Sequence, residues 1–294
     1  MDRTLSQRII SLLRTCSIEL SPRDAAAADR LRDWFDPGTM VFVSFPPSVN
    51  FPAVADACMH LRRAGFVPVP HVVARRLPSF ADASEFLRRV ADDAAVTQIL
   101  LLGGDTPRPA GPFDSALALL ATGAVERYGI TSVAFAGYPE GHPQIANAAL
   151  QAALHAKLEL AASRGLAVSL ITQFGFDAQP ILNWIAAQRA AGVNCPIRIG
   201  LAGPASVATL AKYAVRCGIG ASLRALTHGH TAIARILAEA DPGPLVEALA
   251  NGENPATPID ALHFFCFGSA QRTAAWLKGR HALGGSTGQA RPQP

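Results

Sequence analysis

The stretch 132-SVAFAGYPEGHP-143 decides the fold class of this chain. Residues 132–137 form an apolar run typical of a buried strand, and residues 138–143 follow at once as a polar loop that contains two prolines. Parallel α/β proteins show this change where a strand delivers functional side chains to the carboxyl end of its sheet. We therefore expect functional residues in the loop that begins at Tyr138.

The same pattern recurs at three other places along the chain. The apolar run 67–73 contains Pro70 and His71. The run 98–102 is followed by Gly103, Gly104 and Asp105. The run 168–171 is followed by Thr172, Gln173, Phe174 and Gly175. Each strand–helix repeat takes roughly thirty residues, which is the spacing of βα units. The sequence thus predicts a parallel sheet with polar residues from four strands at one rim.

Counting the apolar runs predicts a closed barrel. Strands are expected at 40–45, 67–73, 98–102, 132–137, 168–171, 196–201, 217–221 and 261–267, of which the seventh is short and rich in glycine. Helices are expected at 4–15, 24–35, 51–64, 79–93, 113–128, 146–163, 179–191, 205–216, 223–239, 244–250 and 269–283. We expect an α/β fold of the (β/α)8 TIM barrel type over residues 39–284. Residues 1–38 would form an N-terminal helical extension, and residues 285–294 a disordered tail.

Composition excludes several classes of protein. With 294 residues, 50% hydrophobic and 16% charged, the chain suits one barrel-sized domain. Its net charge of +4 comes from scattered basic residues, so nucleic acid is not an expected partner. Its five cysteines include no CxxC pair, which favours a reducing compartment. No apolar run reaches the roughly 18 residues needed to span a bilayer, so we expect a soluble, cytoplasmic protein. A metal site is not expected, because His228 and His230 lack a third ligand nearby.

Six motifs, in chain order, are similar to those of one enzyme family. SFPP (44–47), GGDTP (103–107), AGYPEGHP (136–143) and ITQFGFD (171–177) are similar to its FFPP, RGD, A-x-YPE-x-HP and ITQFFFD. AGVNCPIRIGL (191–201) and HFFCFG (263–268) are similar to its AGI-x-x-PI-x-PGI and HFYTLN. From about Phe42 to Leu277 the chain therefore resembles the methylenetetrahydrofolate reductases.

This resemblance implies a fold, a reaction and a set of ligands. The family is a (β/α)8 barrel that binds FAD at its carboxyl rim. It passes hydride from NADH or NADPH through the flavin to methylene-tetrahydrofolate and produces methyl-tetrahydrofolate. The sequence does not choose between NADH and NADPH, because it contains no Rossmann unit with a ribose-reading acid. It also leaves the oligomeric state open, including a homo-oligomer.

The resemblance also implies roles for individual residues. Asp105 and Gln173 would act in catalysis, with Asp105 near the flavin ring and Gln173 against the pterin or nicotinamide. Residues expected to bind the cofactor are His71, Gly104, Asp105, Tyr138, His142 and Lys157. Residues expected to bind the substrate are Gln173, Phe174 and Phe176. Taken singly, each also has a structural interpretation, as a capped loop histidine, a turn, rim packing or a solvated lysine.

One departure from the family pattern affects the expected chemistry. The family carries a glutamate three residues before the first of two prolines, which protonates the folate so that its methylene group opens to an iminium ion. At SFPP that position is Val43, and general acid catalysis is typically worth ~10² to 10⁴ in rate. The helix after GHP is also nearly all alanine and leucine. Two alternatives therefore stay open: direct hydride transfer without FAD, and a non-catalytic folate- or flavin-binding protein that acts through a partner.

Overall fold

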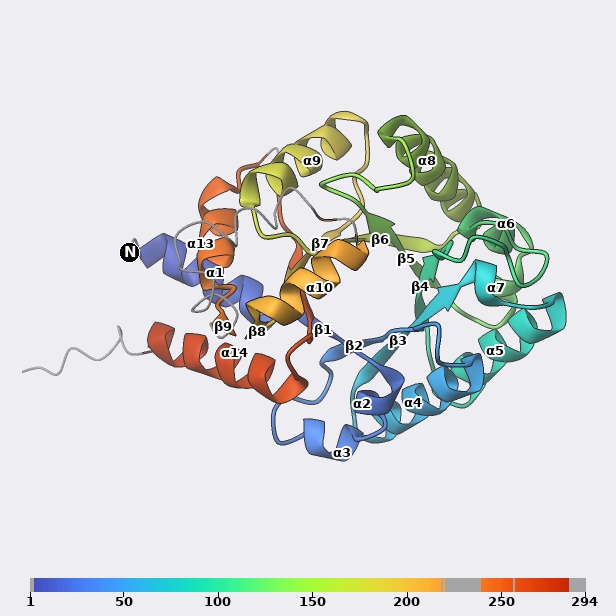
Figure 1. The fold of residues 1–294 in the computed structure, drawn as a ribbon, viewed down its shortest axis with the longest axis horizontal. Helices are drawn as coiled ribbons and strands as arrows, with labels where there is room; N and C mark the ends of the chain where they lie inside the picture. Colours follow the sequence, from blue (N-terminus) through green and yellow to red (C-terminus); the bar gives the residue numbers. More distant parts are fainter. Residues whose placement is uncertain (1–2, 218, 220–238, 256, 286–294) are drawn as a thin grey trace, which may run out of the picture.

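The structure is a computed structural model that describes residues 3–217, 219, 239–255 and 257–285. Parallel strands close into a barrel in the order β1-β10-β7-β6-β5-β4-β3-β2, with helices around the outside (Figure 1). The barrel strands are β1 (Ser17–Leu20), β2 (Met40–Val43), β3 (Val67–Val73), β4 (Gln98–Leu102), β5 (Ser132–Gly137), β6 (Ala167–Thr172), β7 (Ile197–Ala202) and β10 (Ala261–Phe265). The predicted (β/α)8 barrel is confirmed.

The first strand of the barrel is not the predicted one. Ser17–Leu20 pairs in parallel with both β2 and β10, so the strand predicted at 40–45 is the second of the barrel. The N-terminal segment therefore contributes a barrel strand, and the predicted division at residue 38 is wrong. A four-residue strand that directly follows a helix gives too short an apolar run to recognise by period, and only its two neighbours complete its hydrogen bonds.

The strand predicted at 217–221 is not needed to close the barrel. Cys217 is the last residue of helix α10 (Val207–Cys217), and most of 218–221 lies outside the described residues, as do most of the helix predicted at 223–239 and the tail after residue 285. Strand β8 (Ala205–Ser206) instead pairs with β9 (Glu239–Ala240) in a small antiparallel sheet.

Helices surround the barrel at the predicted places. They are α1 (Arg3–Arg14), α2 (Pro22–Ala25), α3 (Ala28–Leu31), α4 (Phe51–Arg63), α5 (Phe80–Asp92), α6 (Ala116–Ala121), α7 (Ala124–Arg127), α8 (Asn147–Ser163), α9 (Ala178–Ala190), α13 (Gly243–Gly252) and α14 (Ala270–Gly285), with a 3₁₀ turn η1 (Ala74–Arg76). Ser21, Asn50, Ser79 and Ser115 cap helices by accepting a backbone N–H bond. Gly123, at φ +72°, splits the helix predicted at 113–128 into α6 and α7.

Alternation along the strands separates an apolar cluster inside the barrel from the larger core outside it. Phe42, Val69, Leu100, Ala134 and Ile171 come from five neighbouring strands and form a separate apolar cluster, which we place inside the barrel. Ile18, Leu20, Val41 and Val43 belong to the larger core that the helices cover. Because successive strand residues face opposite sides, Val43 points away from the barrel interior.

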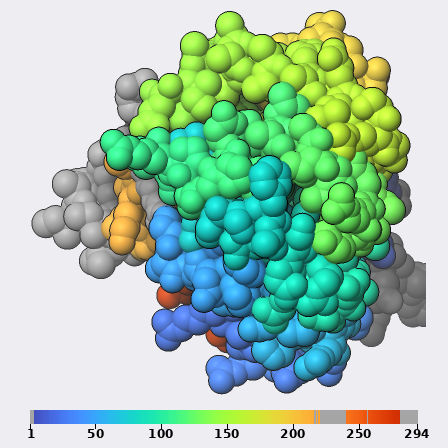
Figure 2. All heavy atoms as spheres, turned by 90° about the vertical axis from the view of Figure 1, so that its right-hand side faces the viewer, coloured from blue at the N-terminus to red at the C-terminus, as the bar shows by residue number. Residues whose placement is uncertain are grey.

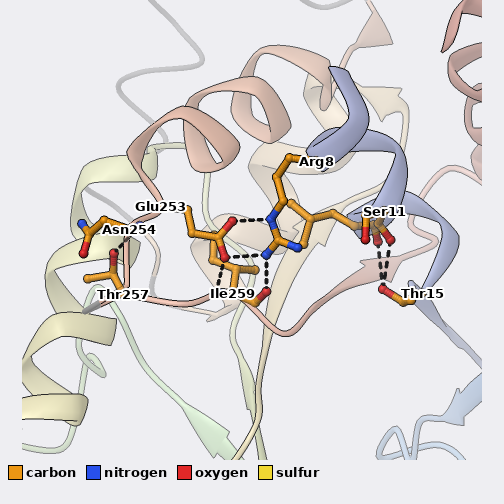
Figure 3. A network of polar contacts seen from close by, with 8 residues as sticks. Arg8, Ser11, Thr15, Glu253, Asn254, Thr257 and Ile259 are labelled. Carbon is orange, nitrogen blue, oxygen red and sulfur yellow. Dashed lines mark hydrogen bonds and ion pairs between the residues drawn. The ribbon is translucent and has the colours of Figure 1, made fainter. Parts of the chain in front are cut away.

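The N-terminal helix is tied to the segment that leads into the last strand. Arg8 binds both carboxylate oxygens of Glu253, and it also donates to the Ile259 carbonyl at 2.7 Å (Figure 3). Glu253 accepts a further bond from the Ile259 N–H at 2.9 Å. Helix α1 also packs against α13 and α14. These contacts hold the start of the chain beside β10, where β1 must pair.

Helices α4 to α8 cover one side of the barrel. The space-filling view shows residues of this part, coloured blue to light green, packed against one another across that face (Figure 2). Among the described residues, no helix is both long and apolar enough to cross a membrane.

Candidate functional site

A carboxylate whose side chain is 15% exposed lies between two histidines inside the barrel. Glu19 comes from β1, His71 from β3 and His263 from β10. The Oε2 atom of Glu19 lies 3.2 Å from His71 Nε2 and 3.5 Å from His263 Nε2. The Nδ1 atom of His263 lies 2.9 Å from the Ser17 hydroxyl oxygen. We call Ser17, Glu19, His71 and His263 the acid cluster.

Burial and charge set the protonation of this cluster. Burial alone would raise the pKa of Glu19, but the charges and hydrogen bonds of His71 and His263 outweigh it and hold that pKa below its ordinary value. Burial lowers the pKa of His263, which is fully buried. Glu19 is therefore a carboxylate in the free protein at neutral pH, and any proton that it gives to a ligand must first reach it.

The local sequence explains why Glu19 points inward. Ile18 and Leu20 are buried in the helix-covered core, so Ser17 and Glu19 face the barrel interior by alternation. Ser21 then caps α2, which begins at Pro22. Glu19 thus stands three residues before a proline, the spacing that the sequence resemblance requires.

The assignment of this position to Val43 is wrong. That assignment took SFPP as the end of the first strand, but Met40–Val43 is β2. Val43 is fully buried under the helices. The motif ELSP at 19–22 carries the same spacing, although it lacks the second proline. Attention to that spacing, rather than to the paired prolines, could have found Glu19 from the sequence.

A cluster of aromatic rings adjoins the acid cluster. Phe265 is the register partner of Glu19, and its ring centroid lies 4.9 Å from that of His263 and 5.6 Å from that of Phe174. Phe267 lies 4.9 Å from Phe174 and stacks on Tyr213 of α10 at 4.0 Å. We call Phe174, Phe176, Tyr213, Phe265 and Phe267 the aromatic shelf. Flat rings of a ligand could stack on such side chains.

Two of the predicted regions meet in a small crevice. Tyr138, Glu140, Gln173 and Phe174 line it together with neighbours on the same loops, and its volume of about 10 Å³ admits little more than a water molecule. The Gln173 side-chain oxygen accepts a bond from the Phe174 N–H at 3.1 Å. The Tyr138 and His142 rings meet edge to face at 5.5 Å. The structure thus brings the predicted residues Tyr138, Gln173 and Phe174 together.

Asp105 does not line this crevice and is exposed on the loop after β4. The nearby charge of Arg76 interacts with it. Gly104, which precedes it, has φ +105°, and a Cβ atom there would lie 2.6 Å from a Val73 methyl group. Backbone geometry and packing therefore explain the glycine without a ligand. The roles predicted for Asp105 and Gly104 remain predictions.

Lys157 is directed at the outer side of the barrel wall. Its amine lies 5.0 Å from the centre of the Phe135 ring, and Phe135 belongs to the helix-covered core. Burial lowers the pKa of Lys157 to about 8. Lys157 lies ten positions after the first residue of α8, which corresponds to about 15 Å of helix. It is therefore far from the end of α8 that follows the rim loop.

The residues predicted to bind FAD lie in different parts of the barrel, and the predicted use of FAD stays a prediction. His71 is directed at Glu19 inside the barrel, and Lys157 at Phe135 outside it. The rim guanidinium groups of Arg75 and Arg76 donate to backbone carbonyls rather than to open space. The residues predicted for the flavin are thus spread over the interior, the rim and the outer wall.

Metal binding has no support among the described residues. They contain no group of three or more histidine, cysteine, aspartate or glutamate side chains that could hold an ion. His228 and His230 lie outside the described residues.

Comparison with known proteins identifies a family and a fold. Residues 57–224, more than half of the chain, match the sequence model of the methylenetetrahydrofolate reductase family. A dihydropteroate synthase from Thermus thermophilus has 15% identity, covers 91% of this chain and 93% of its own, and superposes with a TM-score of 0.51. A putative phosphonomutase from Burkholderia cenocepacia has 13% identity, covers 97% and 99%, and has a TM-score of 0.50. At such identities the two structures show a shared barrel fold alone.

Proposed function

Because this chain belongs to the methylenetetrahydrofolate reductase family, we propose that it reduces a methylene-folate to a methyl-folate, with Glu19 as the proton donor. The observation that carries the proposal is the position of Glu19 inside the barrel, between His71 and His263. The family match spans residues 57–224, so Glu19 and His263 lie outside it and add support that the match does not contain.

The geometry suits a reaction that needs a proton and a flat electrophile at neighbouring places. Glu19 and Phe265 are paired in register, and Phe265 belongs to the aromatic shelf. A pterin ring stacked on the shelf would have its bridging methylene group near the acid cluster. Stacking holds the ring in place, and the barrel walls exclude water from the reacting atoms.

In this reaction the proton and the hydride go to different atoms. The Glu19 O–H bond breaks as a new N–H bond forms on one of the two nitrogens that share the methylene bridge. The bond from that nitrogen to the methylene carbon then breaks, which leaves an iminium ion. A hydride with its electron pair moves to the methylene carbon and completes the methyl group. General acid catalysis of this kind typically contributes ~10² to 10⁴ in rate.

A reduced nicotinamide is the proposed hydride donor, and we propose that the transfer is direct. The sequence resemblance implies transfer through FAD, but two of the residues predicted to bind that cofactor point elsewhere, His71 at Glu19 and Lys157 at Phe135. A nicotinamide ring, by contrast, needs a flat surface beside the substrate, and the aromatic shelf offers one. Which of the two nicotinamide nucleotides is used depends on the ribose phosphate, to which no described residue is assigned.

The non-catalytic alternative loses its main argument. That alternative rested on the absence of the family glutamate at Val43, and Glu19 supplies a carboxylate inside the barrel. Its partner protein therefore has no observation in the structure to support it.

Two measurements test the proposal. The purified protein is examined for visible flavin absorbance, with and without added FAD. It is then mixed without oxygen with NADH or NADPH and methylene-tetrahydrofolate, and methyl-tetrahydrofolate is quantified. We expect product without flavin absorbance, and a loss of roughly 10²-fold or more in Glu19→Gln.

Other outcomes would change the proposal in specific ways. Product that appears only with FAD would replace direct transfer by the flavin route. Undiminished activity in Glu19→Gln would remove Glu19 from the reaction. An absence of product with either nucleotide, with and without FAD, would overturn the proposed reductase.

A further inference from the structure

We propose that His71 and His263 store the proton that Glu19 delivers, so that Glu19 is loaded from an imidazole inside the barrel wall. This inference rests on the proposed function, because it concerns the proton of the same reaction. It assigns His71 a place in proton supply, in contrast to the flavin contact implied by the sequence resemblance.

The geometry of the two rings is the first argument. Both Nε2 atoms face the same oxygen, Glu19 Oε2, at 3.2 Å from His71 on β3, one strand beyond β2, and at 3.5 Å from His263 on the neighbouring strand β10. Neither Nε2 atom has another hydrogen-bond partner among the described residues, so each is left facing that oxygen. When the Ser17 hydroxyl donates to His263 Nδ1, the neutral ring carries its hydrogen on Nε2, facing Glu19.

The charge balance of the cluster is the second argument. Glu19 with two neutral imidazoles leaves one buried negative charge, and one added proton makes the cluster neutral. The groups that act on His263 are Glu19 from β1, His71 from β3 and Arg198 from β7. Arg198 opposes a positive charge on His263, and His263 is also the more deeply buried ring and the one farther from Glu19 Oε2, so we assign the transfer to His71.

Each transfer is balanced and needs no further reagent. The His71 Nε2–H bond breaks as an O–H bond forms on Glu19 Oε2, which leaves a neutral imidazole and a carboxylic acid. The acid then gives the same proton to the folate nitrogen and becomes a carboxylate again. His71 regains a proton from water before the next cycle.

The first test measures Glu19 directly in the protein without ligands. Isotope-edited NMR follows the protonation of the Glu19 carboxyl group, assigned by its loss in Glu19→Gln. We expect Glu19 to take up its proton at a pH about one unit higher in His71→Asn than in the wild type, because His71 provides the largest influence that lowers its pKa. His60→Asn, an exposed change on α4, is the matched control and should have no effect. An unchanged Glu19 titration in folded His71→Asn overturns the relay. If His71→Asn does not fold, His71→Gln is used for the same comparison.

The second test measures the pH dependence of folate reduction. Interacting groups titrate together, so the proton that Glu19 delivers is held by the acid cluster as a whole. Without the His71 imidazole the cluster should lose this proton at a lower pH. The alkaline limb of kcat/KM should therefore move to lower pH by about one unit in His71→Asn. A merely structural role would lower the rate at every pH without moving the limb, and that result overturns the relay. A wild-type protein without reductase activity overturns the proposed function instead, and the NMR comparison then still decides whether the histidines hold the proton.

Discussion

At the scale of single residues, the direction of a side chain decides what it can do. Glu19 and Val43 lie on neighbouring strands and both precede a proline by three residues, yet Glu19 faces the interior and Val43 the helices. Both directions follow from strand alternation once each strand is placed. A substitution at Glu19 is therefore expected to affect the reaction, and a substitution at Val43 the stability of the fold.

Val43→Glu should destabilise the protein and should not increase folate reduction. A carboxylate at this fully buried position would lie among apolar side chains without a partner, at a cost of at least about 3 kcal/mol in the free energy of unfolding. Urea unfolding measures the loss, and Val43→Ile, which keeps the position apolar, is the control. An increase in reductase rate without a loss of stability would mean that position 43 reaches the active site.

Lys157→Met should stabilise the protein at neutral pH. The pKa of Lys157 is lowered from 10.5 to about 8, so below pH 8 the lysine is charged in both states and folding carries the whole cost of its burial. That cost falls as the pH rises from about 8 to 10.5 and vanishes above. We expect a gain of about 1 to 3 kcal/mol near neutral pH that shrinks across this range.

Thermal unfolding of both proteins as a function of pH checks the Lys157 prediction. The same variant also tests the predicted role of Lys157 at a cofactor phosphate. Weaker FAD binding, or a loss of stability at neutral pH, would contradict this prediction, because it would show that the Lys157 amine makes a favourable polar contact.

At the scale of elements, one turn organises two loops at the rim. Arg76 in η1 donates to the carbonyls of Phe45, Pro46, Pro47 and Val49, and its guanidinium lies 3.9 Å from the centre of the Phe45 ring. Its neighbour Arg75 donates to the carbonyls of Thr106, Pro107 and Asp114. The turn after β3 thus holds the loop after β2 with one arginine and the loop after β4 with the other.

Arg76→Ala should loosen the loop at 45–49 and leave the barrel folded. Four carbonyls lose their donor, and hydrogen bonds from a charged group are worth about 1.5 to 3 kcal/mol each, much of which water replaces at a partly exposed site. Hydrogen exchange should rise at 45–49 in Arg76→Ala and at 106–114 in Arg75→Ala. Exchange that rises equally at both loops in either variant would contradict the division between the two arginines.

At the scale of the whole molecule, the barrel closes only when the two ends of the chain meet. Strand β1 pairs with β10, and Arg8 of α1 binds Glu253 and the Ile259 carbonyl just before β10. The closing contacts therefore lie between segments from opposite ends of the sequence (Figure 3).

Arg8→Ala should weaken this closure by about 1 to 3 kcal/mol in the free energy of unfolding, because Glu253 is left partly buried without its cation. Urea unfolding measures the change. In the double variant Arg8→Ala with Glu253→Gln, part of the loss should return, since the uncompensated charge is gone. A loss that stays the same in the double variant would show that the Ile259 contact alone matters.

The sequence by itself determined the parallel barrel and the family to which it belongs. Apolar runs that end in polar loops, at a spacing of about thirty residues, predict strand and helix positions because local periodicity is enough to distinguish them. The motifs around Tyr138 and Gln173 likewise indicate two loops that the structure brings together in one crevice.

Only the tertiary structure decided which strand comes first and which of the two positions that precede a proline by three residues, 19 or 43, points into the barrel. Ser17 and His263 are separated by 246 residues in sequence, and their contact exists because β1 pairs with β10 when the barrel closes. A four-residue strand owes its existence to the backbone hydrogen bonds of both neighbours, which no local pattern records. The side of the sheet that Glu19 faces, and the two histidines that it meets there, follow from that closure.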